Sequence, residues 1–177
     1  MTYRKYLLLA IVSVALTGCA AHLKKGDKTT TVKVGDDATK MLVLNMIGGR
    51  DATDSTDWEP FKGLWRQALK EDATALGAPF VPQEGEPRST GEPGTLLVVD
   101  VADFRFLTAS ARYGLGIMIG NAFVQAKVSF RDLKTGEVWG EQSYDTSSTA
   151  WEGIFSAMTD KQVRAICKEI TAELSKH

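Results

Sequence analysis

The sequence predicts an α+β domain in two layers, with a mixed sheet of four to five strands and two helices packed on one face. Two segments, 57–77 and 159–174, carry apolar residues at helical spacing. Apolar or alternating runs of strand length lie before and between them. Because an amphipathic helix must bury its apolar side, both helices are expected to cover the same sheet.

The first strand is predicted in "KMLVLNMI", residues 40–47, whose continuous apolar run is typical of a buried strand. The glycines and polar residues of 48–57 end it. Apolar residues then recur at helical spacing up to Gly77, which predicts an amphipathic helix of about five turns. Asp57 suits the N-cap of this helix, and Gly77 suits its C-terminal stop.

The second half of the domain is predicted to contain three strands and the last helix. The prolines and glycines of 78–94 indicate an irregular crossing with room for one short strand. The apolar centre of 95–107 is typical of a strand covered on both faces. Residues 122–133 alternate, with Ala126, Val128 and Phe130 on one side.

A hairpin and a capping motif complete the pattern. "DLKTGE", residues 132–137, predicts a tight turn with Gly136 at a positive φ, which returns the chain as a strand in 137–148. Thr159 and Gln162 match a capping box at the start of the last helix. The first crossover is expected to be parallel and right-handed, and the later strands antiparallel.

The chain begins with a segment typical of secretion. Two basic residues, Arg4 and Lys5, precede an apolar run of eleven residues. This run is too short for a bilayer core of ~30 Å, which needs about 20 helical residues. "LTGC", residues 16–19, resembles the lipobox of bacterial lipoproteins. The resemblance implies cleavage before Cys19, a diacylglyceryl thioether on its sulfur, and usually an amide-linked acyl chain.

The alternatives to a lipobox are an ordinary cleaved signal with an unrelated cysteine, or an uncleaved anchor. The preferred organisation has a signal peptide at 1–18, the lipidated cysteine and a flexible tether at 19–38, and one domain at 39–177. "TTTVKV", residues 29–34, is β-prone and offers an edge strand as the alternative to a tether.

The expected location is the outer membrane of a Gram-negative bacterium, with the domain facing the periplasm. Several acyl chains, palmitate among them, hold a protein firmly on a bilayer. Ala20 follows the cysteine at the position where an aspartate would be similar to an inner-membrane retention signal. The membrane is therefore a predicted partner of this chain, through its N-terminal lipid.

Charge and cysteine content argue against a nucleic-acid-binding protein and against a disulfide-stapled domain. The chain has 21 basic and 22 acidic residues without a basic tract, which argues against nucleic-acid binding. Cys167 has no partner for a disulfide once Cys19 is acylated. It is expected to be a small apolar thiol on a helix face.

Three segments and the last helix resemble a known family. The segments are "LLVVDVADFR" (96–105), "RYGLGIMIGNA" (112–122) and "VSFRDLKTGEVW" (128–139). From Lys40 onward the layout is similar to small bacterial lipoproteins catalogued as a domain of unknown function. In fold these are similar to CsgG-like and TolB N-terminal-like periplasmic modules. The resemblance implies an envelope role, often within assemblies, and transfers no active site.

The sequence predicts no catalytic residue, metal ligand or cofactor. His22 lies in the expected tether and His177 is the last residue, so neither can be assigned to a triad or a zinc site. Gly114, Gly116 and Gly120 superficially match a nucleotide loop, but a strand follows them where a phosphate site needs a helix N-terminus. We therefore do not expect an enzyme.

The candidate interaction surface consists of apolar residues near the glycines and two tryptophans: Leu115, Ile117, Met118, Ile119, Trp139 and Trp151. The alternative for the glycine-rich segment is packing within the domain's own core. Trp139 is expected to share an outward register with Glu137 and Glu141, and Trp151 to lie in a loop. Exposed aromatic residues favour interfaces.

The function expected from these features is that of a lipid-anchored periplasmic module. It would bind or assemble without catalysis, with an envelope protein or further copies of itself as partner. A carrier for an apolar or glycan ligand is the alternative. A hydrolase built on Glu137 and Glu141 has less support, because a surface hairpin offers no cleft for paired carboxylates.

Overall fold

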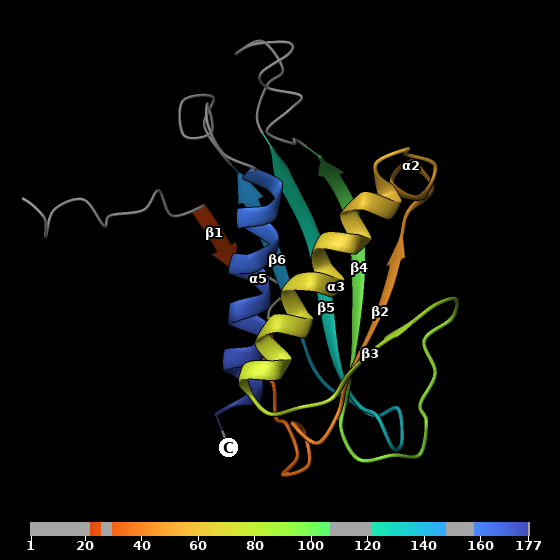
Figure 1. The fold of residues 1–177 in the computed structure, drawn as a ribbon, viewed down its shortest axis with the longest axis vertical. Coiled ribbons are helices and arrows are strands. Elements are labelled where there is room, and N and C mark those ends of the chain that lie inside the picture. Colours follow the sequence, from red (N-terminus) through yellow and green to blue (C-terminus); the bar gives the residue numbers. More distant parts are fainter. Residues whose placement is uncertain (1–21, 26–29, 107–121, 148–157, 177) are drawn as a thin grey trace, which may run out of the picture.

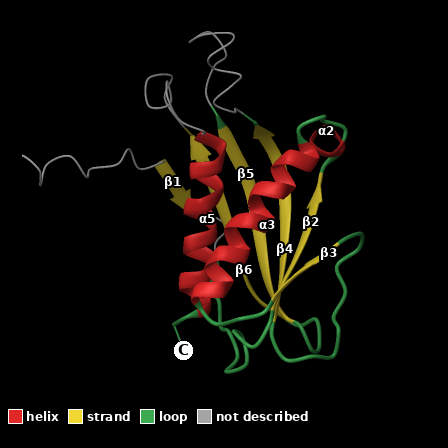
Figure 2. Ribbon diagram, in the orientation of Figure 1, coloured by secondary structure: helices red, strands yellow, loops and turns green. Residues whose placement is uncertain are grey.

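The computed structural model describes residues 22–25, 30–106, 122–147 and 158–176. These residues form a six-stranded mixed sheet with two long helices on one of its faces (Figures 1 and 2). The elements are β1 (His22–Lys25), β2 (Leu42–Gly48), α2 (Arg50–Thr53), α3 (Trp58–Ala75), β3 (Phe80–Gln83), β4 (Thr95–Arg105), β5 (Phe123–Asp132), β6 (Val138–Ser147) and α5 (Met158–Leu174). The predicted α+β class is confirmed.

The strand order is β1-β6-β5-β4-β2-β3. β2 pairs in parallel with both β3 and β4, while β4, β5 and β6 form the predicted antiparallel meander. The short strand expected in 78–94 is β3, at one edge of the sheet. Pro82 is compatible with that position because an edge strand does not need every backbone N–H.

The main core lies between the sheet and the helices. Phe61, Trp65 and Leu69 of α3 and Ile166 and Ile170 of α5 are fully buried there. Each such side chain contributes about 1.5–3 kcal/mol by leaving water. The core fixes the helices on one face and leaves the loops at both ends of the sheet to form sites.

A smaller apolar cluster lies on the opposite face of the sheet. Val43, Leu96, Val98 and Leu133 are buried in it, with Met41 packed beside them. The first half of β4 is therefore covered on both faces, as its continuous apolar run predicted.

Residues 30–38, expected as part of a flexible tether, instead lie on the domain. The Thr30 N–H donates to the Glu141 carbonyl at 2.8 Å, and the Lys33 N–H donates to the Trp139 carbonyl at 3.2 Å. Val34 is buried in the main core. The physical reason is that β6 has an open edge, whose backbone groups this β-prone segment satisfies. β1 continues the same pairing and adds a sixth strand to the expected four to five.

Gly77, Gly136 and Asp57 occupy the ends of elements that the sequence predicted for them. Gly77 and Gly136 have φ of 71° and 82°, as expected for a helix end and a hairpin. Asp57 occupies the N-cap of α3 without a side-chain capping bond, and its own N–H donates to Ser55 Oγ. The short helix α2, in the segment expected as a turn, was not predicted.

The predicted capping-box pair docks α5 on the sheet. Thr159 Oγ1 donates to the carbonyl of Arg105 at the end of β4, and Gln162 Nε2 donates to the carbonyl of Ala122 just before β5. The two side chains that the sequence assigned to a helix cap therefore also bond to the backbone at the ends of β4 and β5.

Within the described ranges, none of the helices combines the length and apolar character that a bilayer crossing requires.

Candidate functional site

Trp139 is the member of the predicted interaction surface that falls within the described residues. The other predicted site residues lie outside them: Cys19, Leu115, Ile117, Met118, Ile119 and Trp151. Trp139 is the second residue of β6, half-buried, beside a register shift between Phe130 and Arg131 of β5. It alternates with the buried Gly140 and packs against the main core, so it is not a fully exposed contact residue.

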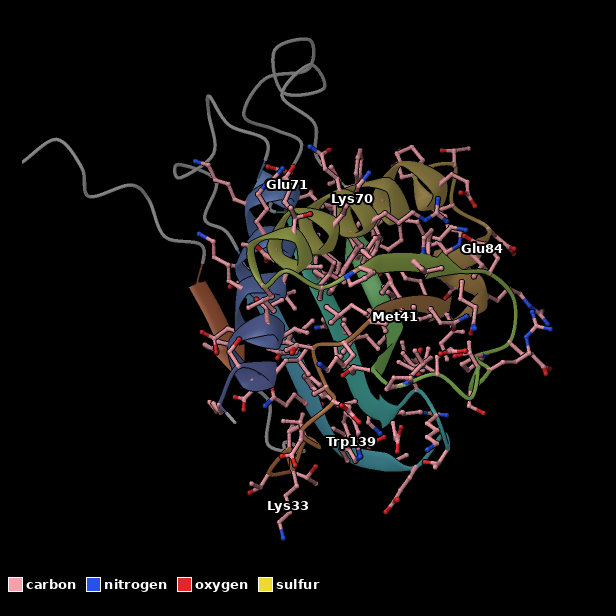
Figure 3. The ribbon with its side chains drawn as sticks, turned by 60° about the horizontal axis from the view of Figure 1, so that its bottom comes forward. Lys33, Met41, Lys70, Glu71, Glu84 and Trp139 are labelled. Carbon is pink, nitrogen blue, oxygen red and sulfur yellow. The ribbon has the colours of Figure 1, made fainter. Side chains whose placement is uncertain are left out.

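Trp139 lies at the end of the sheet where the β5–β6 hairpin turns (Figure 3). A pocket of about 320 Å³ opens beside it. Residues 30–34, which lie along β6, are named the edge segment. Three segments that are distant in sequence line the pocket: the turn after the edge segment, the loop before β4, and the hairpin. The lining residues are Gly35, Asp36, Asp37, Gly91, Pro93, Gly94, Asp132, Lys134 and Trp139.

Backbone contacts hold the walls of this pocket in place. Gly94 has a φ of 147°, and a Cβ built on it would stand 2.4 Å from the Met41 carbonyl oxygen, so only glycine fits. The Leu133 N–H donates to the Gly94 carbonyl at 3.0 Å, which ties the loop to the hairpin. A Cβ on Gly35 would lie 3.5 Å from Trp139 Cζ2, so the turn rests against the indole ring.

The pocket combines an aromatic ring with charged groups. Asp36, Asp37 and Asp132 supply carboxylates, and Lys134 supplies one ammonium group, which gives a net negative charge. The Lys134 N–H donates to Asp132 Oδ1 at 2.8 Å and orients that carboxylate. Among the described residues, no group of three His, Cys, Asp or Glu could hold a metal ion. The arrangement can accept hydrogen bonds and pack a flat ligand face.

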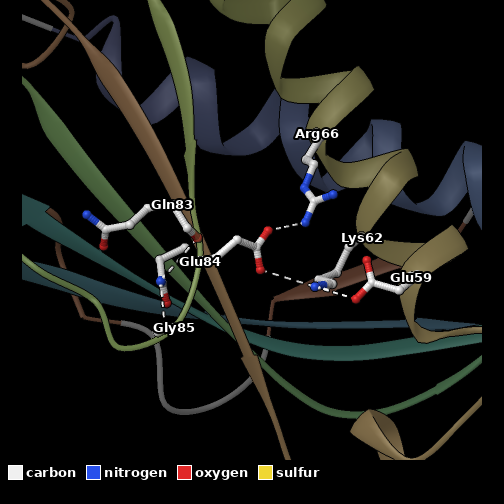
Figure 4. Close-up of polar contacts among 7 residues, drawn as sticks. Glu59, Lys62, Arg66, Gln83, Glu84 and Gly85 are labelled. Atoms are coloured by element: carbon white, nitrogen blue, oxygen red, sulfur yellow. Dashed lines mark hydrogen bonds and ion pairs between the residues drawn. The ribbon is translucent and has the colours of Figure 1, made fainter.

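A second polar cluster, which we name the Lys62 clamp, joins α3 to the segment after β3 (Figure 4). Lys62 Nζ lies 2.7 Å from Glu59 Oε1 and 3.2 Å from Glu84 Oε2, and Arg66 pairs with the other oxygen of Glu84. The Lys62 side chain is only 9% exposed, and its ammonium lies 5.9 Å from the Trp58 ring. The cluster was not predicted from the sequence. Its local signal was the spacing of three between Glu59 and Lys62.

Two other features considered in the sequence, the Glu141 carboxylate and the Cys167 thiol, have structural surroundings. Lys127 Nζ forms a cross-strand ion pair with Glu141 Oε2 at 2.7 Å, which engages one of the two glutamates considered for hydrolysis. Cys167 is fully buried, as expected for a helix-face thiol. Burial raises the pKa of that thiol well above its ordinary value, which disfavours the reactive thiolate.

The structure is a small two-layer α+β domain with a pocket at one end of its sheet. PelC from Paraburkholderia phytofirmans, crystallised as a dodecamer, shares this fold in two crystal forms with a TM-score of 0.53. The two PelC chains are 13% and 12% identical in sequence to this one. Each match covers 89% of this chain and 99% of PelC.

Two further solved structures are similar. An uncharacterised protein is 10% identical with a TM-score of 0.50, over 78% of this chain and 94% of its own. XCC0632 from Xanthomonas campestris, a protein of the DUF330 family, is 10% identical with a TM-score of 0.48, over 86% and 89%. No family model matches the sequence, and no curated protein matches it.

These similarities show a fold shared with PelC and with an uncharacterised protein. The expected likeness to CsgG-like and TolB N-terminal-like modules is not shown by them and stays a prediction.

Proposed function

We propose that the protein is a lipoprotein of the Gram-negative outer membrane whose periplasmic domain acts by assembly and not by catalysis. The observation that supports this most strongly is the fold shared with PelC, a protein that forms a dodecamer, over nearly its whole chain. Further copies of this chain are accordingly the first expected partner, and another envelope protein the second.

The lipobox supplies the anchor in this proposal. Two residues separate Cys19 from His22, the first residue of β1. β1 is antiparallel to β6, and His22 lies opposite Ser147 at the end of that strand. A lipid on Cys19 would therefore hold this end of the sheet close to the bilayer.

Four other elements begin or end at the same end of the sheet, which we name the lipid end (Figure 1). β4 finishes there at Arg105 and β5 starts there at Phe123, paired with each other. Ser147 ends β6 opposite Phe123, and α5 follows from Met158, with Thr159 bonded to Arg105. The chain thus leaves and re-enters the described fold twice at the lipid end.

The two segments that begin and finish at the lipid end contain the remaining predicted contact residues. We infer that these form the surface for other copies or for an envelope partner, close to the membrane: Leu115, Ile117, Met118, Ile119 and Trp151. Apolar side chains of this kind favour partner contacts when they are exposed.

Lipidation is tested in Gram-negative cells that express the full chain and are fed an alkyne analogue of palmitate. The wild-type protein is expected to be labelled and to sediment with outer membranes, while Cys19→Ser loses both properties. Cys167→Ser is a matched control, because it removes the chain's other cysteine and should keep the label. Equal labelling of wild type and Cys19→Ser contradicts the anchor.

Assembly is tested by the mass of the lipidated protein after gentle detergent extraction and by cross-linking in intact membranes. We expect an oligomer that Ile117→Asp weakens and that Val81→Asp leaves intact. Val81 is a suitable control because it is an apolar residue, 44% exposed, on the distant edge strand β3. A monomer in both measurements contradicts self-association.

A further inference from the structure

The Trp139 pocket faces away from the lipid end. Trp139 is the second residue of β6, whereas Ser147, opposite His22, is the last. The strand runs between the two, so the pocket and the start of β1 occupy opposite ends of the sheet. If the chain is anchored as proposed, the pocket opens toward the periplasm. Ligand binding at this pocket depends on the proposed anchor only for this orientation.

The pocket has the groups that recognise a polar ligand with one flat apolar face. Trp139 is half-buried and is one of the residues that line the cavity. Asp36, Asp37 and Asp132 offer carboxylate oxygens as acceptors, and Lys134 offers donors. Ligand sites generally combine an aromatic wall with a few placed polar groups in this manner.

We propose that the Trp139 pocket binds a neutral pyranose unit of a glycan. The C–H face of the sugar packs on the indole ring, which supplies a large apolar surface. Sugar hydroxyls donate to the three carboxylates, and the Lys134 ammonium donates to a sugar oxygen. The cavity of about 320 Å³ is at the small end of the ~300–1,000 Å³ range of ligand pockets, which suits one or two sugar units.

Apolar and anionic ligands fit the pocket less well than a neutral sugar does. An apolar chain would remove water from four charged side chains without giving them partners. A uronate or phosphate would meet three carboxylates against one ammonium group, and like charges repel. A neutral, hydroxyl-rich ligand satisfies the charged groups and also uses the ring.

The test uses the full-length protein purified in a detergent without a sugar headgroup. Cellotetraose, chitotetraose and tetragalacturonate are titrated by calorimetry, as neutral hexose, N-acetylated and acidic probes. We expect saturable binding of at least one neutral probe and at least tenfold weaker binding of the acidic one. Trp139→Ala should weaken the neutral interaction at least tenfold, and Trp139→Phe should retain most of it.

Two further variants guard against misfolding of Trp139→Ala. Gly35→Val keeps the indole but adds methyl groups beside it, because the Cβ site lies 3.5 Å from Trp139 Cζ2. Asp37→Asn changes an exposed side chain and should weaken binding severalfold. Val138→Ala, the half-exposed neighbour of Trp139 on β6, is the matched control and should bind as wild type does.

The proposal is overturned if none of the three probes binds, if the acidic probe binds best, or if Gly35→Val and Trp139→Ala both bind normally while folded. These outcomes are separate from the assembly test. An intact oligomer that binds no sugar contradicts only the sugar-binding proposal. A monomer that still binds sugar contradicts only the proposed assembly.

Discussion

Gly140 of β6 and Val32 of the edge segment approach so closely that a Cβ on Gly140 would stand 2.8 Å from Val32 Cα. The same Cβ would lie 3.1 Å from the Thr31 carbonyl oxygen. Both neighbours are backbone atoms, which cannot move aside as a flexible side chain can. The contact explains how residues 30–33 lie flat along β6.

Gly140→Ala is therefore expected to displace the edge segment and destabilise the protein. Overpacking of this kind typically costs about 1–3 kcal/mol. Urea unfolding monitored by circular dichroism measures the change. Gly63→Ala is the matched control, because a Cβ there meets nothing within 4 Å and alanine favours the α3 helix. A wild-type midpoint for Gly140→Ala would show that the segment is not held against β6.

Phe61 is expected to be a principal core residue. It is fully buried, and its ring stacks on Phe104 with centroids 4.2 Å apart. Phe61→Ala should destabilise the protein by about 3–5 kcal/mol, because it removes the ring and leaves a cavity. Phe104→Ala should cost less, since Phe104 is only partly buried. Equal losses in denaturant unfolding would contradict this order.

The Lys62 clamp is expected to depend more on the lysine stem than on its charge. Glu59 and Glu84 are 69% and 64% exposed, so losing the ammonium group leaves both carboxylates in water. Lys62→Met keeps an apolar stem and should change stability by under about 1 kcal/mol. Lys62→Ala should cost more, through lost packing on Trp58. A large loss in Lys62→Met would instead assign the stability to the ion pairs.

Two adjacent carboxyls of α3 are expected to respond to pH in opposite directions. A hydrogen bond from Arg164 of α5 is the main cause that holds the pKa of Glu71 below 4.5. Its contribution is present above pH 4.5 and is lost as the pH falls through the lowered pKa. Partial burial raises the pKa of Asp72 above 3.8. The protonated carboxyl therefore contributes stability that is fully present below pH 3.8 and is lost as the pH rises through the raised pKa.

Thermal unfolding from pH 3 to 7 tests this pair. Glu71→Gln should be less stable than wild type at pH 7, and the difference should shrink toward pH 3. Asp72→Asn should be equal to or more stable than wild type at pH 7, with a difference that also shrinks in acid. Parallel shifts of the same sign in both variants would contradict the assignment.

The remaining thiol of the native lipidated protein, that of Cys167, is expected to be unreactive. Cys167 is fully buried, and burial raises its pKa. With Cys19 joined to lipid as proposed, Ellman's reagent should find no fast thiol in the folded protein and one after unfolding. A fast thiol in the folded wild type, lost in Cys19→Ser, would show that the sulfur of Cys19 is free.

Periodicity alone was enough to predict most elements of this domain. The apolar stripe of α3, the alternation in β5 and the glycine of the hairpin are local patterns, read from neighbouring residues. An apolar stripe is buried by a helix and an alternating run by a strand. The fold class and the order of the elements could therefore be predicted from these patterns. Trp139 was singled out for the same local reason, its place in a polar hairpin.

The surroundings of Trp139 could not be predicted in that way. Its pocket joins residues near 35, 93 and 132, which only the sheet order brings together. The Lys62 clamp likewise depends on Glu84, 22 residues away, and the edge segment depends on the open side of β6.

By itself the sequence determined the α+β class, the element order and the expectation of a lipid on Cys19, because periodicity and leader motifs are properties of contiguous residues. Tertiary structure decided that residues 30–38 belong to the domain and that Trp139 lies in a cavity. It also decided that this cavity and the start of β1 are at opposite ends. These relationships depend on which strands pair, and backbone pairing between distant segments leaves no periodic signal in the chain.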